Sequence, residues 1–265
     1  MSLLGWWARW RSRAQDWLAQ ARGEVEPPPG QRRPIVRRGW RYTSMQFTRE
    51  DAQSRMLTFR PQALLIGYTR TMMGFLRLHP RPRRLLMIGL GGGSLAKYCH
   101  RHLPDCAIDV VEINPHVLAL RRLFRVPRDD ARFRVHLDDG AQFVARRPAS
   151  CDVLLVDGYD ERGIPPALAS QRFYDDCRAA LREGGVMSLN LYCDDVARHL
   201  ERIARAFDGR CCAVPQPGMS NQVAFAWVGV PPGPEDAALP AALREDLAAE
   251  FARVDAALAA AGARD

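Results

Sequence analysis

The chain has 265 residues, of which 47% are hydrophobic, so it can form one large domain with appendages, and its formal net charge is +8. No apolar run approaches the roughly 18 residues of a membrane-spanning helix, arginine interrupts the apolar N-terminus where a signal peptide would continue, and the basic residues are too scattered for a nucleic-acid stripe. The seven cysteines are odd in number and form no Cys-x-x-Cys pair, which indicates a cytoplasmic protein with no bound metal. From the apolar runs and the scattered basic residues we expect no transmembrane segment and no nucleic-acid partner.

Residues 1–30 are predicted to form an amphipathic helix followed by a proline-rich linker. Four tryptophans share one face of this helix, with arginines largely elsewhere: Trp6, Trp7, Trp10 and Trp17. Such a helix can lie on a membrane surface. The interpretation that we favour is that it docks on the body of the protein or on a second subunit.

Residues 31–67 are predicted to form a short N-terminal β segment, and a helix is expected from Tyr68 onward. Polar and apolar residues alternate along a first run that includes Tyr42, Ser44 and Gln46. A second extended run carries Gln53.

Residues 68–230 are predicted to form the main domain, in which strands alternate with helices. The predicted strands are continuous apolar runs at 85–88, 108–111, 133–137, 153–156 and 186–191, and 223–228 adds a last strand. This alternation indicates an α/β fold with a parallel sheet covered on both faces. Gly184-Gly185 is expected to stop the helix that precedes the strand at 186–191.

A glycine-rich turn, Gly89-Leu90-Gly91-Gly92-Gly93, follows the first strand of this domain and opens a helix. Gly89, Gly91 and Gly93 let the backbone approach a ligand at the helix N-terminus. The second strand ends in Glu112, roughly 20 residues on, where a carboxylate would hold ribose hydroxyls. The pattern therefore predicts nucleoside binding.

Acidic residues also follow the third and fourth strands, and carboxyl strand ends are where open α/β sheets bind ligands. Asp138 and Asp139 precede Gly140, and Asp157 is followed by Asp160. Asp139 could instead be only a helix N-cap. With no GK[ST] phosphate loop in the chain, these carboxylates favour a positively charged adenosine compound over a nucleotide.

Residues 231–265 are predicted to form a linker and a C-terminal helix. One face of that helix is apolar, which indicates packing or dimerisation, and it carries Leu243, Leu247, Phe251, Val254 and Leu258.

These residues resemble the polyamine aminopropyltransferases, the spermidine and spermine synthases. The resemblance rests on a set of short motifs: His79-Pro80-Arg81-Pro82, the glycine turn, Val111-Glu112-Ile113-Asn114, Asp139-Gly140, Asp157-Gly158-Tyr159-Asp160, Phe173-Tyr174 and Gly184-Gly185. It covers Arg84–Asn190 and more weakly residues 40–78, roughly 150 residues in all.

The resemblance implies a methyltransferase-like Rossmann fold with a mostly parallel seven-stranded sheet, and a homodimer. It implies decarboxylated S-adenosylmethionine as the co-substrate, an amine acceptor and no metal. The match places the general base on Asp157, with Asp160 anchoring the amine or closing the site. Gln53, or alternatively Gln46, matches a glutamine that touches the nucleoside, and Tyr68 matches a substrate-side tyrosine.

Two departures from the family pattern keep other functions open. Gly92 stands where the family has an aspartate that holds the aminopropyl amine, and Arg70 stands where the family has an acidic residue. A methyltransferase that uses intact S-adenosylmethionine is therefore an alternative, in which Arg70 or Arg55 would receive the methionine carboxylate. A second alternative is a non-catalytic protein that binds a nucleoside and a partner.

Overall fold

The computed structural model describes residues 30–47, 54–160, 162–231, 233–234 and 239–262. The predicted helix at 1–22 and Gln53 lie outside these residues. Among the described residues, no helix is both long and apolar enough to cross a bilayer.

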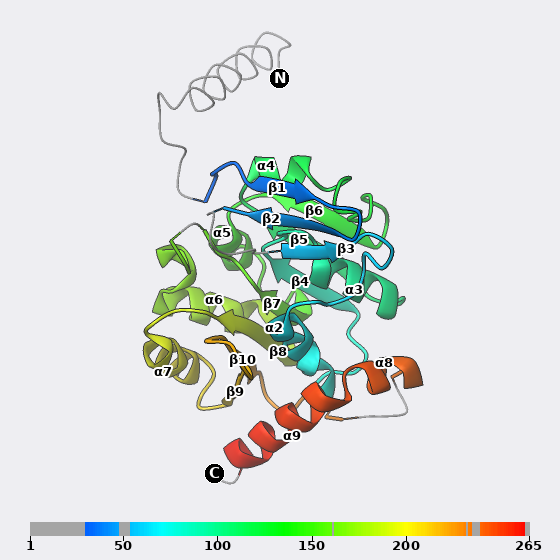
Figure 1. Cartoon of the computed structure of the whole chain (residues 1–265). Helices are drawn as coiled ribbons and strands as arrows, with labels where there is room; N and C mark the ends of the chain where they lie inside the picture. Colours follow the sequence, from blue (N-terminus) through cyan, green and yellow to red (C-terminus); the bar gives the residue numbers. More distant parts are fainter. Residues whose placement is uncertain (1–29, 48–53, 161, 232, 235–238, 263–265) are drawn as a thin grey trace.

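A seven-stranded sheet forms the centre of the molecule, in the order β6-β5-β4-β7-β8-β10-β9 (Figure 1). Its five parallel strands are β4 (Arg84–Ile88), β5 (Ala107–Glu112), β6 (Phe133–Leu137), β7 (Cys151–Val156) and β8 (Leu181–Leu191). The antiparallel strands β9 (Cys211–Pro215) and β10 (Gln222–Trp227) complete one edge. The predicted α/β fold class with a mostly parallel seven-stranded sheet is confirmed.

Helices cover both faces of the sheet because successive side chains of each buried strand point to opposite faces. On β4, Leu85 and Met87 belong to one buried cluster, whereas Leu86 and Ile88 belong to the other. The first cluster includes side chains from α2 (Gly67–Met72), η1 (Met73–Arg77), α3 (Ser94–His102), α4 (Pro115–Ala119), α8 (Ala241–Asp246) and α9 (Ala248–Gly262). The second includes side chains from α5 (Gly140–Ala145), η2 (Pro166–Leu168), α6 (Gln171–Ala180) and α7 (Val196–Ala206).

A separate antiparallel sheet precedes these strands in the chain. It consists of β1 (Ile35–Arg38), β2 (Tyr42–Gln46) and β3 (Ser54–Leu57), with β2 in the middle. This N-terminal sheet and α9 lie at opposite ends of the molecule (Figure 1).

The C-terminal helices pack on the chain's own body. Leu243, Leu247, Phe251 and Val254 are buried, and Val254 lies where a side chain at Gly74 would have to go, 2.5 Å from an added Cβ. Arg77 forms an ion pair with Asp255 at 2.8 Å. Of the two alternatives for the apolar stripe, packing therefore accounts for this face of the described helices.

The predicted helix stop at Gly184-Gly185 is wrong. Helix α6 ends at Ala180, and β8 begins at Leu181, so both glycines lie inside the strand. The register between β7 and β8 shifts there, and Gly184 takes a φ of 73° while its N–H donates to the Val228 carbonyl. The glycines therefore permit an irregularity in the strand.

Candidate active site

A cavity of about 1180 Å³ lies at the carboxyl ends of the parallel strands. Its walls come from the glycine turn, the segments that follow β5, β6, β7 and β8, helix α2, and the segment before β10. This is the edge at which the strand-end carboxylates were predicted to meet.

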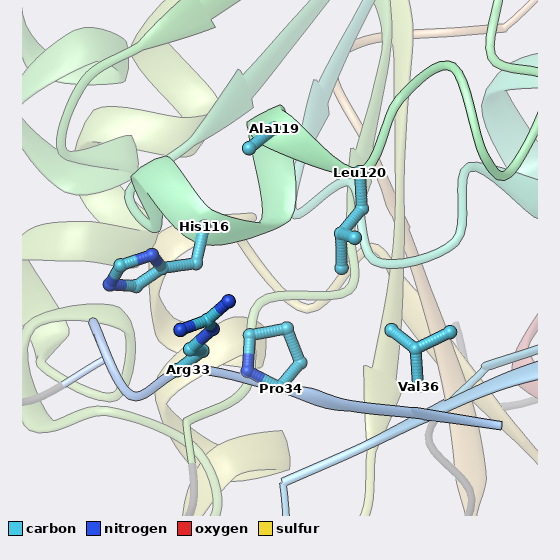
Figure 2. A pocket seen from close by; sticks show the side chains of 6 residues that line it. All are labelled: Arg33, Pro34, Val36, His116, Ala119 and Leu120. Carbon is cyan, nitrogen blue, oxygen red and sulfur yellow. The ribbon is translucent and has the colours of Figure 1, made fainter. Parts of the chain in front are cut away.

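A smaller cavity of about 430 Å³ lies elsewhere, between the start of β1 and helix α4 (Figure 2). Its lining is Arg33, Pro34, Val36, His116, Ala119 and Leu120. Partial burial and the neighbouring Arg33 lower the pKa of His116. None of the predicted site residues that the structure describes lines this cavity, so the larger one is the candidate active site.

The glycine turn follows β4 closely because three of its residues take left-handed backbone conformations. Gly89, Gly91 and Gly93 have φ values of 90°, 51° and 68°. A Cβ at Gly89 would lie 2.2 Å from the Asp157 carbonyl oxygen, so only glycine lets β4 and β7 end side by side. Gly89 and Gly91 line the cavity, whereas Gly93 begins α3 under Val126.

Glu112 ties the end of β5 to this turn. Its carboxylate accepts hydrogen bonds from the backbone N–H of Leu90 at 2.9 Å and of Asn114 at 2.8 Å, and it lines the cavity. Burial raises the pKa of Glu112, while the backbone donors act in the opposite direction. The carboxylate is thereby held in one orientation at the strand end.

Of the three residues predicted after β6, two line the cavity. Asp139 lines it and also caps α5, accepting from the Gln142 N–H at 3.0 Å, so its N-cap role is shown and its contact with a ligand stays a prediction. Gly140 lines it too, and a Cβ there would lie 2.5 Å from Ile88. Asp138 is outside the described lining, and its carboxylate pairs with Arg146 at 2.7 Å.

Asp157 is the centre of a polar network. Its Oδ2 accepts a hydrogen bond from the Tyr68 hydroxyl at 3.1 Å, and its Oδ1 accepts one from Asn190 Nδ2 at 3.0 Å. Asn221 Nδ2 in turn donates to Asn190 Oδ1 at 2.9 Å. All four residues line the cavity.

Burial raises the pKa of Asp157, whereas the hydrogen bonds from Asn190 and Tyr68 lower it. For Tyr68, burial raises the phenol pKa, and the neighbouring Asp157 raises it further. The phenol therefore stays protonated and remains a donor to the carboxylate.

Sequence reasoning missed Asn190 and Asn221. Asn190 was detectable, because it is a polar residue at the carboxyl end of a predicted strand. Asn221 carried no local signal, since it reaches the site only through the pairing of β10 with β8.

Asp160 lies in a tight turn after β7 and lines the cavity. Its Oδ1 accepts from the Arg162 N–H at 2.7 Å, and its own N–H donates to the Gly163 carbonyl at 3.0 Å. The residue is 8% exposed.

The predicted use of Arg70 or Arg55 as a carboxylate receptor is wrong. Arg70 forms ion pairs with Asp246 and Glu250 of the C-terminal helices, both at 3.1 Å. Arg55 lies over the Tyr42 ring on the N-terminal sheet. Neither is among the described residues that line the cavity.

Gly92 leaves no room for the aspartate of the family pattern. A Cβ there would lie 2.9 Å from the Ser54 Cβ and 3.0 Å from the Phe124 ring. The Gly92 N–H donates to Ser54 Oγ, and its carbonyl accepts from Lys97 Nζ, both at 2.9 Å. Lys97 also donates to the Phe124 carbonyl at 2.8 Å, and burial lowers its pKa to about 7.

Gln46, the alternative to Gln53, is buried on β2, and its Oε1 has no hydrogen-bond partner among the described atoms. It is not among the described lining residues of the cavity.

The cavity is acidic although the protein is basic. The lining includes five carboxylates and one arginine: Glu112, Asp139, Asp157, Asp160, Asp194 and Arg162. Such a cavity attracts cations. Among the described residues, no cluster of three or more acidic, histidine or cysteine side chains could hold a metal ion.

An open α/β sheet whose glycine turn faces strand-end carboxylates places the chain in the methyltransferase-like fold class. A family model described as the spermine/spermidine synthase domain matches residues 65–209. The chain belongs to this family, and the resemblance predicted from the motifs is confirmed.

Individual relatives support both the family and the wider class. A polyamine aminopropyltransferase of Chromobacterium violaceum is 36% identical over 187 residues, which are 69% of this chain and 72% of the relative. A human eEF1A lysine and N-terminal methyltransferase is 37% identical over 128 residues, which are 43% of this chain and 18% of the relative. A spermidine synthase crystallised with the transition-state analogue AdoDATO has the same fold, with a TM-score of 0.61 and 21% identity over 83% of this chain and 85% of that one.

Proposed function

We propose that the protein transfers an aminopropyl group from decarboxylated S-adenosylmethionine to a small amine such as putrescine. One observation carries this proposal. A carboxylate at the end of β7, Asp157, lines an acidic cavity beside the glycine turn and is held by Tyr68 and Asn190.

The donor nucleoside would lie along the glycine turn. We propose that Glu112 accepts hydrogen bonds from the ribose hydroxyls and that Asp139 and Gly140 border the adenine. We include Gln53 among the residues proposed to bind the nucleoside because of the family resemblance alone. Asp138 is not among the residues proposed to bind the nucleoside, because its carboxylate forms an ion pair with Arg146.

The acceptor would lie between Asp157, Asp160 and Tyr68. An alkylammonium has a pKa of about 10, like lysine, so it must lose a proton before its nitrogen can attack. Asp157 would hold the cation and take that proton, which frees the nitrogen lone pair to form the new carbon–nitrogen bond. The carbon–sulfur bond breaks, and the sulfur keeps its electron pair, which neutralises the sulfonium. The site must also hold the sulfonium donor and the amine acceptor in line for the attack, and this positioning lowers much of the barrier.

Methyl transfer from intact S-adenosylmethionine is the second candidate, because Gly92 removes the carboxylate that would bind an aminopropyl ammonium. The similarity to a methyltransferase also favours it. Among the described lining residues, Arg162 is the arginine available to the methionine carboxylate.

Calorimetry with the two donors separates these candidates. Tighter binding of decarboxylated S-adenosylmethionine, followed by formation of an aminopropylated amine and methylthioadenosine, supports the proposal. Tighter binding of the intact donor makes methyl transfer the leading candidate. Light scattering on the same preparation tests the homodimer that we propose from the family resemblance.

Asp157→Asn tests the assigned base. We expect turnover to fall by about a hundredfold to ten-thousandfold while methylthioadenosine binds almost unchanged, because the amide cannot take a proton. Asp105→Asn is the matched control, since Asp105 is an exposed residue outside the cavity lining. Equal turnover of the two variants would remove Asp157 from the mechanism.

A further inference from the structure

The positive charge of the chain is concentrated around the N-terminal sheet. Residues 30–66 contain eight arginines and two acidic residues, whereas residues 67–265 contain 26 basic and 25 acidic residues. Both acidic residues of the first segment, Glu50 and Asp51, lie outside the described residues. The described part of this segment therefore has seven arginines and no acid.

The arginines of this sheet point into solvent. All seven described arginines are exposed, and five of them lie in or beside the strands: Arg37, Arg38, Arg41, Arg55 and Arg60. None of these five forms an ion pair with a described acidic side chain, although elsewhere in the described chain Arg70, Arg77, Arg121 and Arg146 all do. Within the described residues, their charge is therefore not neutralised by an acidic side chain.

Two large aromatic side chains project from one end of the same sheet. Trp40 in the β1–β2 turn is 81% exposed, and Phe59 just after β3 is 80% exposed. The two strand ends are neighbours, because the Thr58 N–H donates to the Arg41 carbonyl at 3.0 Å. Arg38, Arg41 and Arg60 therefore adjoin the two rings in the chain. We call these five residues, Arg38, Trp40, Arg41, Phe59 and Arg60, the aromatic–arginine tip.

The charge and the position of the rings restrict what can cover this tip. A second copy that met the tip through the same surface would bring like charges together, which is unfavourable. Single-stranded nucleic acid stacks on rings that lie on a sheet face between basic residues. The face ring here, Tyr42, is already approached by the guanidinium groups of Arg41 and Arg55, at 5.3 and 5.7 Å from its centroid.

We propose that the aromatic–arginine tip attaches the protein reversibly to an anionic phospholipid bilayer. Tryptophan and phenylalanine at the end of the sheet would enter the headgroup region, where amphipathic and apolar rings are favourable. The arginines around them would contact lipid phosphates, which attract each basic residue near the surface. This attachment does not depend on the reaction proposed for the cavity.

Vesicle sedimentation with the full-length chain tests the proposal. We expect binding to vesicles of phosphatidylcholine with phosphatidylglycerol, little binding to pure phosphatidylcholine, and loss of binding at about 0.5 M salt. Trp40→Ala with Phe59→Ala should lower the partition coefficient at least about tenfold, and so should the triple change of Arg38, Arg41 and Arg60 to Gln.

The matched control changes Arg172, Arg198 and Arg205 to Gln. These arginines are exposed on α6 and α7, so the variant loses the same charge away from the tip. It should keep vesicle binding close to that of the unmodified chain. Unchanged binding of both tip variants, equal losses in the control, or failure to bind anionic vesicles overturns the proposal. Tip-dependent binding of a labelled single-stranded oligonucleotide without vesicle binding would also overturn it, in favour of nucleic acid.

Discussion

At the residue scale, the geometry of Asp157 depends on amides that have no acid–base chemistry of their own. Asn190 can turn either its oxygen or its nitrogen toward the carboxylate, and only the nitrogen is a donor. Asn221 donates to the Asn190 oxygen, which leaves the Asn190 nitrogen to face Asp157. Both carboxylate oxygens of Asp157 are therefore oriented before any substrate arrives.

The same hydrogen bonds set the pH at which Asp157 is ionised. Burial raises its pKa, and the donors Asn190 and Tyr68 lower it. Tyr68→Phe removes one donor, so the pKa of Asp157 should rise, and the acidic limb of the kcat/KM profile should move to higher pH. At the optimum we expect a loss of about fivefold to tenfold, the usual worth of one such hydrogen bond. A pH series of initial rates measures both effects, and an unmoved acidic limb would contradict the assignment.

At the scale of elements, buried Lys97 joins helix α3 to the glycine turn and to the chain after α4. Its ammonium donates to the carbonyls of Gly92 and Phe124. The carbonyl of Gly92 is thus held by Lys97, and its N–H by Ser54 of β3. These hydrogen bonds restrict the conformational freedom of the four glycines to one backbone conformation of the turn.

Lys97 also makes stability depend on pH. Its pKa is about 7 in the folded chain and about 10.4 when unfolded. Between these values the unfolded state binds more protons, so the free energy of unfolding should rise with pH, and below about pH 7 this contribution should level off. Relative to Lys97→Met, the native chain should gain up to about 2 kcal/mol between about pH 7 and about pH 9. Urea unfolding at both pH values measures the gain. An equal change in the free energy of unfolding for the native chain and Lys97→Met would contradict it.

At the scale of the whole molecule, the candidate site draws on residues from all parts of the described chain. The glycine turn, Glu112, Asp139 and Asp157 could be predicted because each lies where a recognisable strand ends. The behaviour of Arg70 could not, because its partner Glu250 is 180 residues away and reaches it only when α9 packs against α2. Gly184 was misassigned for a similar reason, since its N–H donates to the carbonyl of Val228, which directly follows β10.

The separation of charge between the cavity and the N-terminal sheet gives a prediction for the reaction itself. An acidic cavity concentrates a cationic acceptor, and salt screens that attraction. We expect kcat/KM for a diamine to fall severalfold between about 20 mM and about 300 mM salt. Binding of neutral methylthioadenosine should change much less. A kcat/KM that is insensitive to salt would contradict the steering role of the cavity carboxylates.

The position of β10 has a consequence for biosynthesis. Asn221 lies directly before β10, so it is synthesised after the glycine turn and the strand-end carboxylates. A nascent chain that has already folded the glycine turn and its carboxylates still lacks the amide that orients Asn190, and the α9 helix that clamps Arg70 of α2 is made later still. The glycine turn and its carboxylates can therefore assemble first, whereas Asp157, the proposed base, becomes correctly oriented only after Asn221 has been synthesised.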